Sequence, residues 1–203
     1  MRLRRYLATR PLLLALVFEG GLVPLALVLA LLLGVAPWAG YRPGGATPAL
    51  AVAATLPLVA GLALLAAAAP GHLRAIDRLI RPLVEAMFRG RGRWAVVTVA
   101  ALAGLGEELL FRGVLQGWLA GLAGPWLAVG VAALVFGPAH YLSWAYFVLA
   151  TAMGLYLGAL YQLSGDLLLP TLVHALYDWI AIEYLLWRRG DAAKPAAGEE
   201  PPG

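Results

Sequence analysis

Few side chains in this chain can exchange protons or bind a metal ion, and half of the acidic and histidine residues lie inside long apolar stretches. A cluster is formed by Glu107, Glu108 and Arg112 in one stretch, His140 in a second, and His174 and Asp178 in a third. Glu19 and Glu183 also lie in apolar stretches but outside this cluster. Ionisable groups at membrane depth cost several kcal/mol and usually mark function. Carboxylates beside histidines are also the usual groups of general acid–base catalysis. The pattern therefore predicts a hydrolytic site assembled from three helices.

The spacing within each stretch suggests how these groups pair. Glu108 and Arg112 are four residues apart, so they share one helix face and can neutralise each other. Glu107 points about 100° away and has no local partner, which leaves it free to act as a general base. His174 and Asp178 are also four residues apart, and we expect Asp178 to hold the imidazole in one orientation.

Other chemistries are weakly supported or excluded. The Glu108–Arg112 pair by itself would more often be structural, because ion pairs also fix helix packing. A serine protease is not indicated, because neither Ser143 nor Ser164 lies in a Gly-x-Ser-Gly run. Asp166 lacks the Gly-x-Gly-Asp context of aspartyl intramembrane proteases, and no His-Glu-x-x-His zinc motif is present. The chain has no cysteine, which excludes thiol catalysis.

The elements that position these residues are predicted to be membrane helices. Hydrophobic residues make up 62% of the 203 residues and charged residues 13%, about half the share of a soluble domain. A span needs roughly 20 apolar residues. Six stretches qualify: Leu12–Ala36, Pro48–Ala69, Ala95–Leu119, Gly124–Leu142, Trp144–Leu163 and Leu167–Trp187. We therefore expect an all-α polytopic bundle over residues 1–190, followed by a disordered polar tail over residues 191–203.

The distribution of basic residues predicts the orientation of the bundle. With six spans, thirteen arginines and lysines fall on the side of both termini and only Arg42 falls on the other side. The positive-inside rule places the termini in the cytoplasm. Between the second and third spans, residues 73–87 repeat apolar positions every three or four residues, which predicts an amphipathic helix on the cytoplasmic leaflet. The basic blocks fit a lipid bilayer better than nucleic acid. The Arg, Ala, Gly and Leu bias is typical of a bacterial protein, so we expect the inner membrane.

The three motifs together resemble a known family. Glu-Glu-x-x-x-Arg, Phe-x-x-x-His and His-x-x-x-Asn/Asp on successive membrane helices are similar to the CPBP family of CAAX-processing and bacteriocin-processing intramembrane proteases, also called Abi or Rce1-like. The resemblance covers residues 94–187, close to half of the chain. It implies an intramembrane endopeptidase that acts on a membrane-associated peptide or protein. Prenylated substrates are not implied, because a bacterium need not contain them.

The resemblance also implies roles for the site residues. Glu107 and His140 would activate a water molecule, and Glu108 and Arg112 would hold the site together. His174 would donate to the oxyanion while Asp178 orients it, because an ionised aspartate cannot donate a hydrogen bond. Zinc on Glu107, His140 and His174 stays open beside a metal-free mechanism, which we favour slightly. The alternative from another class is a non-catalytic immunity or scaffold protein of the same fold. Substrate sequence and oligomeric state are not determined by these residues.

Overall fold

The computed structural model describes residues 10–192, except for the side chains of residues 72 and 188–192. Nearly all of the tail expected to be disordered lies outside the described residues. Within them every regular element is a helix, which confirms the predicted all-α class. The elements are α2 (Pro11–Leu33), η1 (Pro37–Gly40), α3 (Thr47–Ala68), α4 (Pro70–Phe88), α5 (Arg93–Glu108), η2 (Leu109–Gln116), α6 (Gly117–Ala123), α7 (Pro125–Ala139), α8 (Trp144–Ser164) and α9 (Leu168–Ala192).

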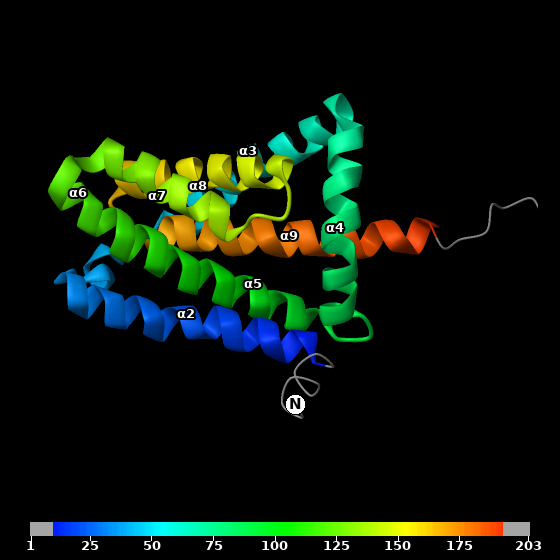
Figure 1. Cartoon of the computed structure of the whole chain (residues 1–203), viewed down its shortest axis with the longest axis horizontal. Coiled ribbons are helices and arrows are strands. Elements are labelled where there is room, and N and C mark those ends of the chain that lie inside the picture. The colour runs from blue at the N-terminus through cyan, green and yellow to red at the C-terminus, as the bar shows by residue number, and fades with distance from the viewer. Residues whose placement is uncertain (1–9, 193–203) are drawn as a thin grey trace, which may run out of the picture.

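All long helices except α4 run roughly along the long axis of the molecule (Figure 1). Helix α5 packs between α2 and α9, and α7 packs on α8. Helix α4 crosses one end of this bundle nearly at a right angle (Figure 1). This crossing is the arrangement expected of a helix that lies in a membrane surface while its neighbours span the membrane.

Four described helices are long and apolar enough to cross a membrane. They are Pro11–Leu33, Thr47–Ala68, the continuous helix Arg93–Ala123, and Trp144–Ser164. Their bounds lie within about four residues of the corresponding predicted spans. Helix α7 is apolar but has only 15 residues, and α9 is long but carries His174, Asp178 and Glu183. The chain is therefore a multi-pass membrane protein by helix length and composition, and the count of six spans stays a prediction.

Helix α4 is amphipathic as predicted, but part of its apolar face packs against the bundle and not against the membrane surface. Val84 and Phe88 are buried against α2 and α5, together with Leu12 and Val96. Leu83 belongs to the same predicted apolar repeat, but its side chain is about half exposed. Periodicity identifies an apolar face but not its partner. Here the end of the bundle covers part of that face.

Both ends of α9 form hydrogen bonds with segments far away in the sequence. At one end, Arg81 on α4 forms an ion pair with Asp77 at 2.7 Å and donates to the Leu185 carbonyl at 3.1 Å. At the other end, the buried Asp166 accepts hydrogen bonds from the backbone N–H groups of Arg42 and Leu168 and from Thr47 Oγ1. These contacts join the two ends of α9 to α4 and to the segment that leads into α3.

Helices α5 and α9 approach closely because Gly104 has no side chain. A Cβ atom there would lie 2.7 Å from the Thr171 carbonyl oxygen and 3.0 Å from the Ala175 nitrogen, both backbone atoms of α9. We expect Gly104→Ala to push α9 away and to cost about 1–3 kcal/mol. Thermal unfolding in one detergent measures this. Gly121→Ala is the matched control, because nothing lies within 4 Å of its Cβ. Equal melting temperatures for the two variants would contradict the prediction.

Candidate active site

The two glutamates lie at a change of helix geometry. Helix α5 ends at Glu108, and the chain continues without a break into the π-helical turn η2, which carries Arg112. Single π-helical turns are rare and occur often at functional sites. Glu107, Glu108 and Arg112 are all buried in the bundle. The widened turn thus places three ionisable groups in an interior that ordinarily excludes them.

Glu108 and Arg112 form the predicted ion pair. Arg112 Nη1 donates to Glu108 Oε1 at 2.8 Å, and both side chains are at most 1% exposed. Arg112 Nη2 also donates to the Gly154 carbonyl at 3.0 Å, which ties the pair to α8. The guanidinium carbon lies 4.7 Å from the centre of the Phe136 ring, within range of a cation–π contact. The Glu108–Arg112 pair therefore links η2 to α8 and α7 in the interior of the bundle.

His174 is held by carboxylates on both of its ring nitrogens. Its Nδ1 donates to Glu108 Oε1 at 2.8 Å, because a carboxylate that pairs with Arg112 is ionised and can only accept. Asp178 Oδ2 lies 3.5 Å from Nε2, as the four-residue spacing predicted. The bond to Glu108 is shorter and was not predicted. Asp178 lies on the partly exposed side of the imidazole, where a reacting group would bind.

His140 reaches the cluster from the end of α7. That helix stops at Ala139, so His140 lies in the turn that leads to α8. Its Nδ1–H donates to the Phe136 carbonyl at 3.0 Å, and its ring stacks on Phe136 at 4.2 Å. Nε2 then points away from its own helix. The turn lies short of α4 along the bundle (Figure 1), and its residues Tyr141, Leu142 and Trp144 are about half exposed or more.

Both histidines present Nε2 to the same carboxylate oxygen. Glu107 Oε2 lies 3.3 Å from His140 Nε2 and 3.9 Å from His174 Nε2. This oxygen is buried and makes no hydrogen bond with any described residue. The side chains of His140 and Asp178 are 26% and 29% exposed, so the cluster opens on their side. One carboxylate oxygen and two imidazole nitrogens thus share a small polar space with an open side.

The expected zinc ligands Glu107, His140 and His174 lie together, but they are not arranged as a metal site. Among the residues that the structure describes, no three histidine or acidic side chains form a group that could hold a metal ion. Glu107 Oε2 also approaches the Nε2 atoms of His140 and His174 directly, at 3.3 and 3.9 Å. We therefore derive no step through a metal.

Two residues that were given no predicted role contribute to the site. Phe136, the first residue of the Phe-x-x-x-His motif, contacts His140, His174 and Arg112 at once, so its ring packs against the whole cluster. Four-residue spacing places Phe136 on the same helix face as His140, which explains this contact. Glu19 on α2 lies against the same region, because a Cβ on Gly106 would be 2.8 Å from the Glu19 carbonyl. The carboxylate of Glu19 is within electrostatic range of Glu107, and its Oε2 has no described hydrogen-bond partner.

Comparison with known proteins agrees with this geometry. Residues 89–180 match the family model described as type II CAAX prenyl endopeptidase, Rce1-like. The uncharacterized protein YpbD of Bacillus subtilis (strain 168) is 36% identical over 86 residues, which are 41% of this chain and 41% of that protein. The match thus spans less than half the length of this curated relative. No solved structure matches the chain. The matched segment contains the whole cluster from Glu107 to Asp178, and residues 89–180 form a domain of the Rce1-like type II CAAX prenyl endopeptidase (CPBP) family.

Proposed function

We propose that this chain hydrolyses a peptide bond of a membrane-associated peptide or protein, with water as the nucleophile. One observation carries the proposal. The Nε2 atoms of His140 and His174 face Glu107 Oε2 at 3.3 and 3.9 Å, while both Nδ1 atoms are engaged elsewhere. The reactive nitrogen of each ring is therefore turned toward one carboxylate oxygen. A water molecule in this space would contact a base from more than one side.

Glu107 and His140 activate the water. The tautomer of His140 follows from its Nδ1–H bond to the Phe136 carbonyl, which leaves a lone pair on Nε2 in the neutral ring. Glu107 Oε2 has an unused acceptor position in the same space. The water oxygen attacks the scissile carbonyl carbon as its proton passes to Glu107. The proton then goes to the leaving nitrogen, the C–N bond breaks, and a carboxylate and an amine are released.

His174 stabilises the oxyanion of the tetrahedral intermediate. Its Nδ1–H is committed to Glu108, so Nε2 can donate only when the ring carries both protons. Glu107, Glu108 and Asp178 lie around the ring, and their negative charges favour that form. Arg112 holds Glu108 in place from the other side. Asp178 thus acts as an electrostatic partner of His174 and not as an oxyanion donor.

A non-catalytic immunity or scaffold protein is less well supported. Buried polar atoms in a purely structural network are nearly always paired. Here Glu107 Oε2 approaches both histidines but forms no hydrogen bond with a described residue, and the cluster opens beside His140 and Asp178. A carboxylate oxygen with unused hydrogen-bonding capacity near an opening suits a site that must receive a substrate and water.

The test is peptide cleavage by the purified full chain in liposomes made up in H₂¹⁸O, over a broad library of membrane-bound peptides. We expect new peptide ends, with one ¹⁸O atom in each new carboxylate. Activity that survives a chelator supports the metal-free mechanism. Activity that a chelator removes and zinc restores would instead assign Glu107, His140 and His174 as zinc ligands. Absence of cleavage, together with a Glu107→Gln variant less heat-stable than wild type, would favour the scaffold function.

We also propose six spans in a bacterial inner membrane, with α4 and both termini at the cytoplasmic face. The arginine-rich segment around α4 and the right-angle crossing of α4 support this orientation. The chain has no cysteine, so chemical labelling of a single introduced cysteine shows on which side of the membrane that residue lies. We expect an impermeant maleimide to label Gly45→Cys in intact spheroplasts, and Arg91→Cys only after lysis. Both sites are exposed, and the cysteine-free parent is the control. Labelling of both from one side would contradict the topology.

A further inference from the structure

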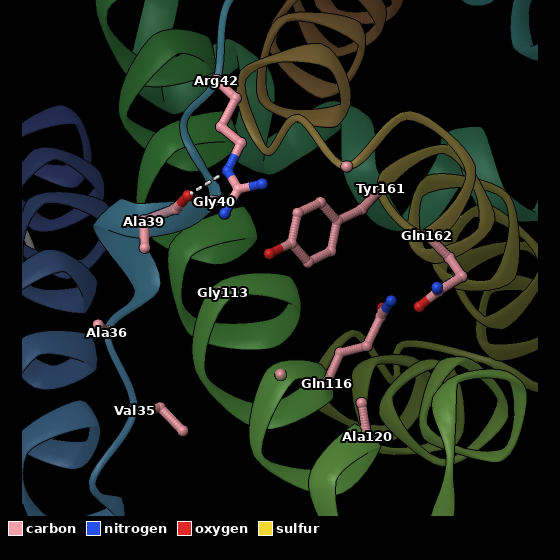
Figure 2. Close-up of a pocket in the computed structure, with 12 residues that line it drawn as sticks. Val35, Ala36, Ala39, Gly40, Arg42, Gly113, Gln116, Ala120, Tyr161 and Gln162 are labelled. Carbon is pink, nitrogen blue, oxygen red and sulfur yellow. Dashed lines mark hydrogen bonds between the residues drawn. The ribbon is translucent and has the colours of Figure 1, made fainter.

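A second cavity lies at the end of the bundle farthest from α4. It has a volume of about 430 Å³ and is lined by the loop around η1, by η2 and α6, and by the end of α8. Arg42, Gln116, Tyr161 and Gln162 extend their polar groups around it (Figure 2). Gln116 is nine residues beyond Glu107 along the same helix, more than two turns away. The cavity is thus separate from the candidate active site.

Arg42 presents a positive charge to this cavity. Its Nε donates to the Ala39 carbonyl at 2.9 Å, which fixes the guanidinium at the rim (Figure 2). The carboxylate of Asp166 already accepts from the Arg42 backbone, from Leu168 and from Thr47. Among the described residues no carboxylate forms an ion pair with the Arg42 side chain. Its terminal nitrogens are therefore free to bind an anion from outside the chain.

Gln116 requires a hydrogen-bond donor. Its side chain is 1% exposed, and Nε2 donates to the Gly158 carbonyl at 3.1 Å. Its Oε1 is buried and has no hydrogen-bond partner among the described residues. Buried amide oxygens are rarely left in this state. The cavity therefore has a cation at its rim, and one of its lining residues has a buried amide oxygen without a hydrogen-bond partner among the described residues.

The surroundings of the cavity are those of a lipid interface. Leu31 and Leu32, at the end of α2, are 82% and 74% exposed. Trp38 on η1 and Trp126 at the start of α7 are also largely exposed. Tryptophan is enriched where a bilayer meets water, and exposed leucines beside it suit acyl chains. A ligand at this depth can therefore be amphiphilic.

We propose that this cavity binds the headgroup of a phospholipid from the leaflet opposite α4. The phosphodiester binds Arg42, and an ammonium or hydroxyl group of the headgroup donates to Gln116 Oε1. The acyl chains lie over the exposed leucines of α2. This chemistry discriminates among lipids that share the same phosphodiester. Phosphatidylethanolamine and phosphatidylglycerol carry a donor, whereas the quaternary ammonium of phosphatidylcholine carries none.

The test is native mass spectrometry of the purified full chain after exchange into detergent with one lipid at a time. We expect wild type to retain phosphatidylethanolamine and phosphatidylglycerol but not phosphatidylcholine. Arg42→Gln should weaken retention about tenfold, because it removes a charge-assisted hydrogen bond. Arg91→Gln is the matched control, an exposed arginine at the other end of the bundle. Gln116→Leu should abolish the preference over phosphatidylcholine.

Further arms separate the lipid from a free anion and guard against misfolding. Inorganic phosphate and glycerophosphoethanolamine should not displace the bound lipid at millimolar concentration. Displacement by either would overturn the lipid assignment in favour of a free phosphate site. Equal retention of phosphatidylethanolamine and phosphatidylcholine by wild type, or equal effects of Arg42→Gln and Arg91→Gln, would overturn the proposal outright. Both comparisons stand even if Gln116→Leu fails to fold.

Discussion

Replacing Glu107 with glutamine is expected to lower kcat/KM for peptide cleavage by about 10²–10⁴-fold, the range for loss of a general base. Glutamine has the same shape but cannot take a proton from water. Glu107 Oε2 forms no hydrogen bond with a described residue, and its contacts are the approaches of the two imidazoles at 3.3 and 3.9 Å, which an amide of the same shape can keep. We therefore expect the melting temperature of the variant to stay close to that of wild type. Initial rates on the best peptide of the library, with melting curves in the same detergent, measure both quantities.

The control for this substitution is Glu183→Gln. Glu183 is a carboxylate on α9 that lies 3.4 Å from Arg93, and it makes no contact with the cluster. The same loss of charge there should leave kcat/KM nearly unchanged. If Glu107→Gln kept more than a tenth of wild-type activity, Glu107 would not be the base. Equal losses in both variants would point to a general effect of intramembrane charge.

Replacing Arg112 with methionine is expected to destabilise the fold by about 3–5 kcal/mol, the usual cost of breaking a buried ion pair. The variant leaves the fully buried carboxyl group of Glu108 without its cation. It also removes the donor to the Gly154 carbonyl, and so the tie to α8. His174 loses its positioning as well, because its Nδ1 bonds to the same Glu108 oxygen. Denaturant or thermal unfolding in one detergent measures the loss.

A matched pair elsewhere in the chain separates burial from spacing. Glu85 and Arg89 on α4 have the same four-residue spacing, but Arg89 is 61% exposed. Arg89→Met should cost only about 0.3–0.5 kcal/mol, as for other exposed helix pairs. The double variant Glu108→Gln/Arg112→Met should be more stable than Arg112→Met alone, because no charge is then left unpaired. Similar costs for the Arg112 and Arg89 variants would show that burial of the pair does not control stability.

The sequence by itself determined the fold class of the protein and which residues form its candidate site. Apolar runs of about 20 residues favour an all-α membrane bundle, since backbone groups in lipid must be paired and a helix pairs them within one such run. Glu107, His140 and His174 stand out because ionisable groups are costly at depth and so are few there. The Glu108–Arg112 pair was also predictable, because four-residue spacing along one helix holds wherever the helix packs.

Only the tertiary structure decided how these groups are connected. The four-residue spacing within α9 places Asp178 near Nε2 of His174. The hydrogen bond from Nδ1 of the same ring to Glu108 exists only because α5 packs against α9. The π-helical turn at η2 and the early end of α7 were equally hidden, since apolar periodicity does not record where a helix widens or stops. The cavity beside Gln116 depends on three segments that meet only after folding. Local spacing is a property of one helix, whereas the orientation of a ring or the partner of a carboxylate is a property of helices packed together.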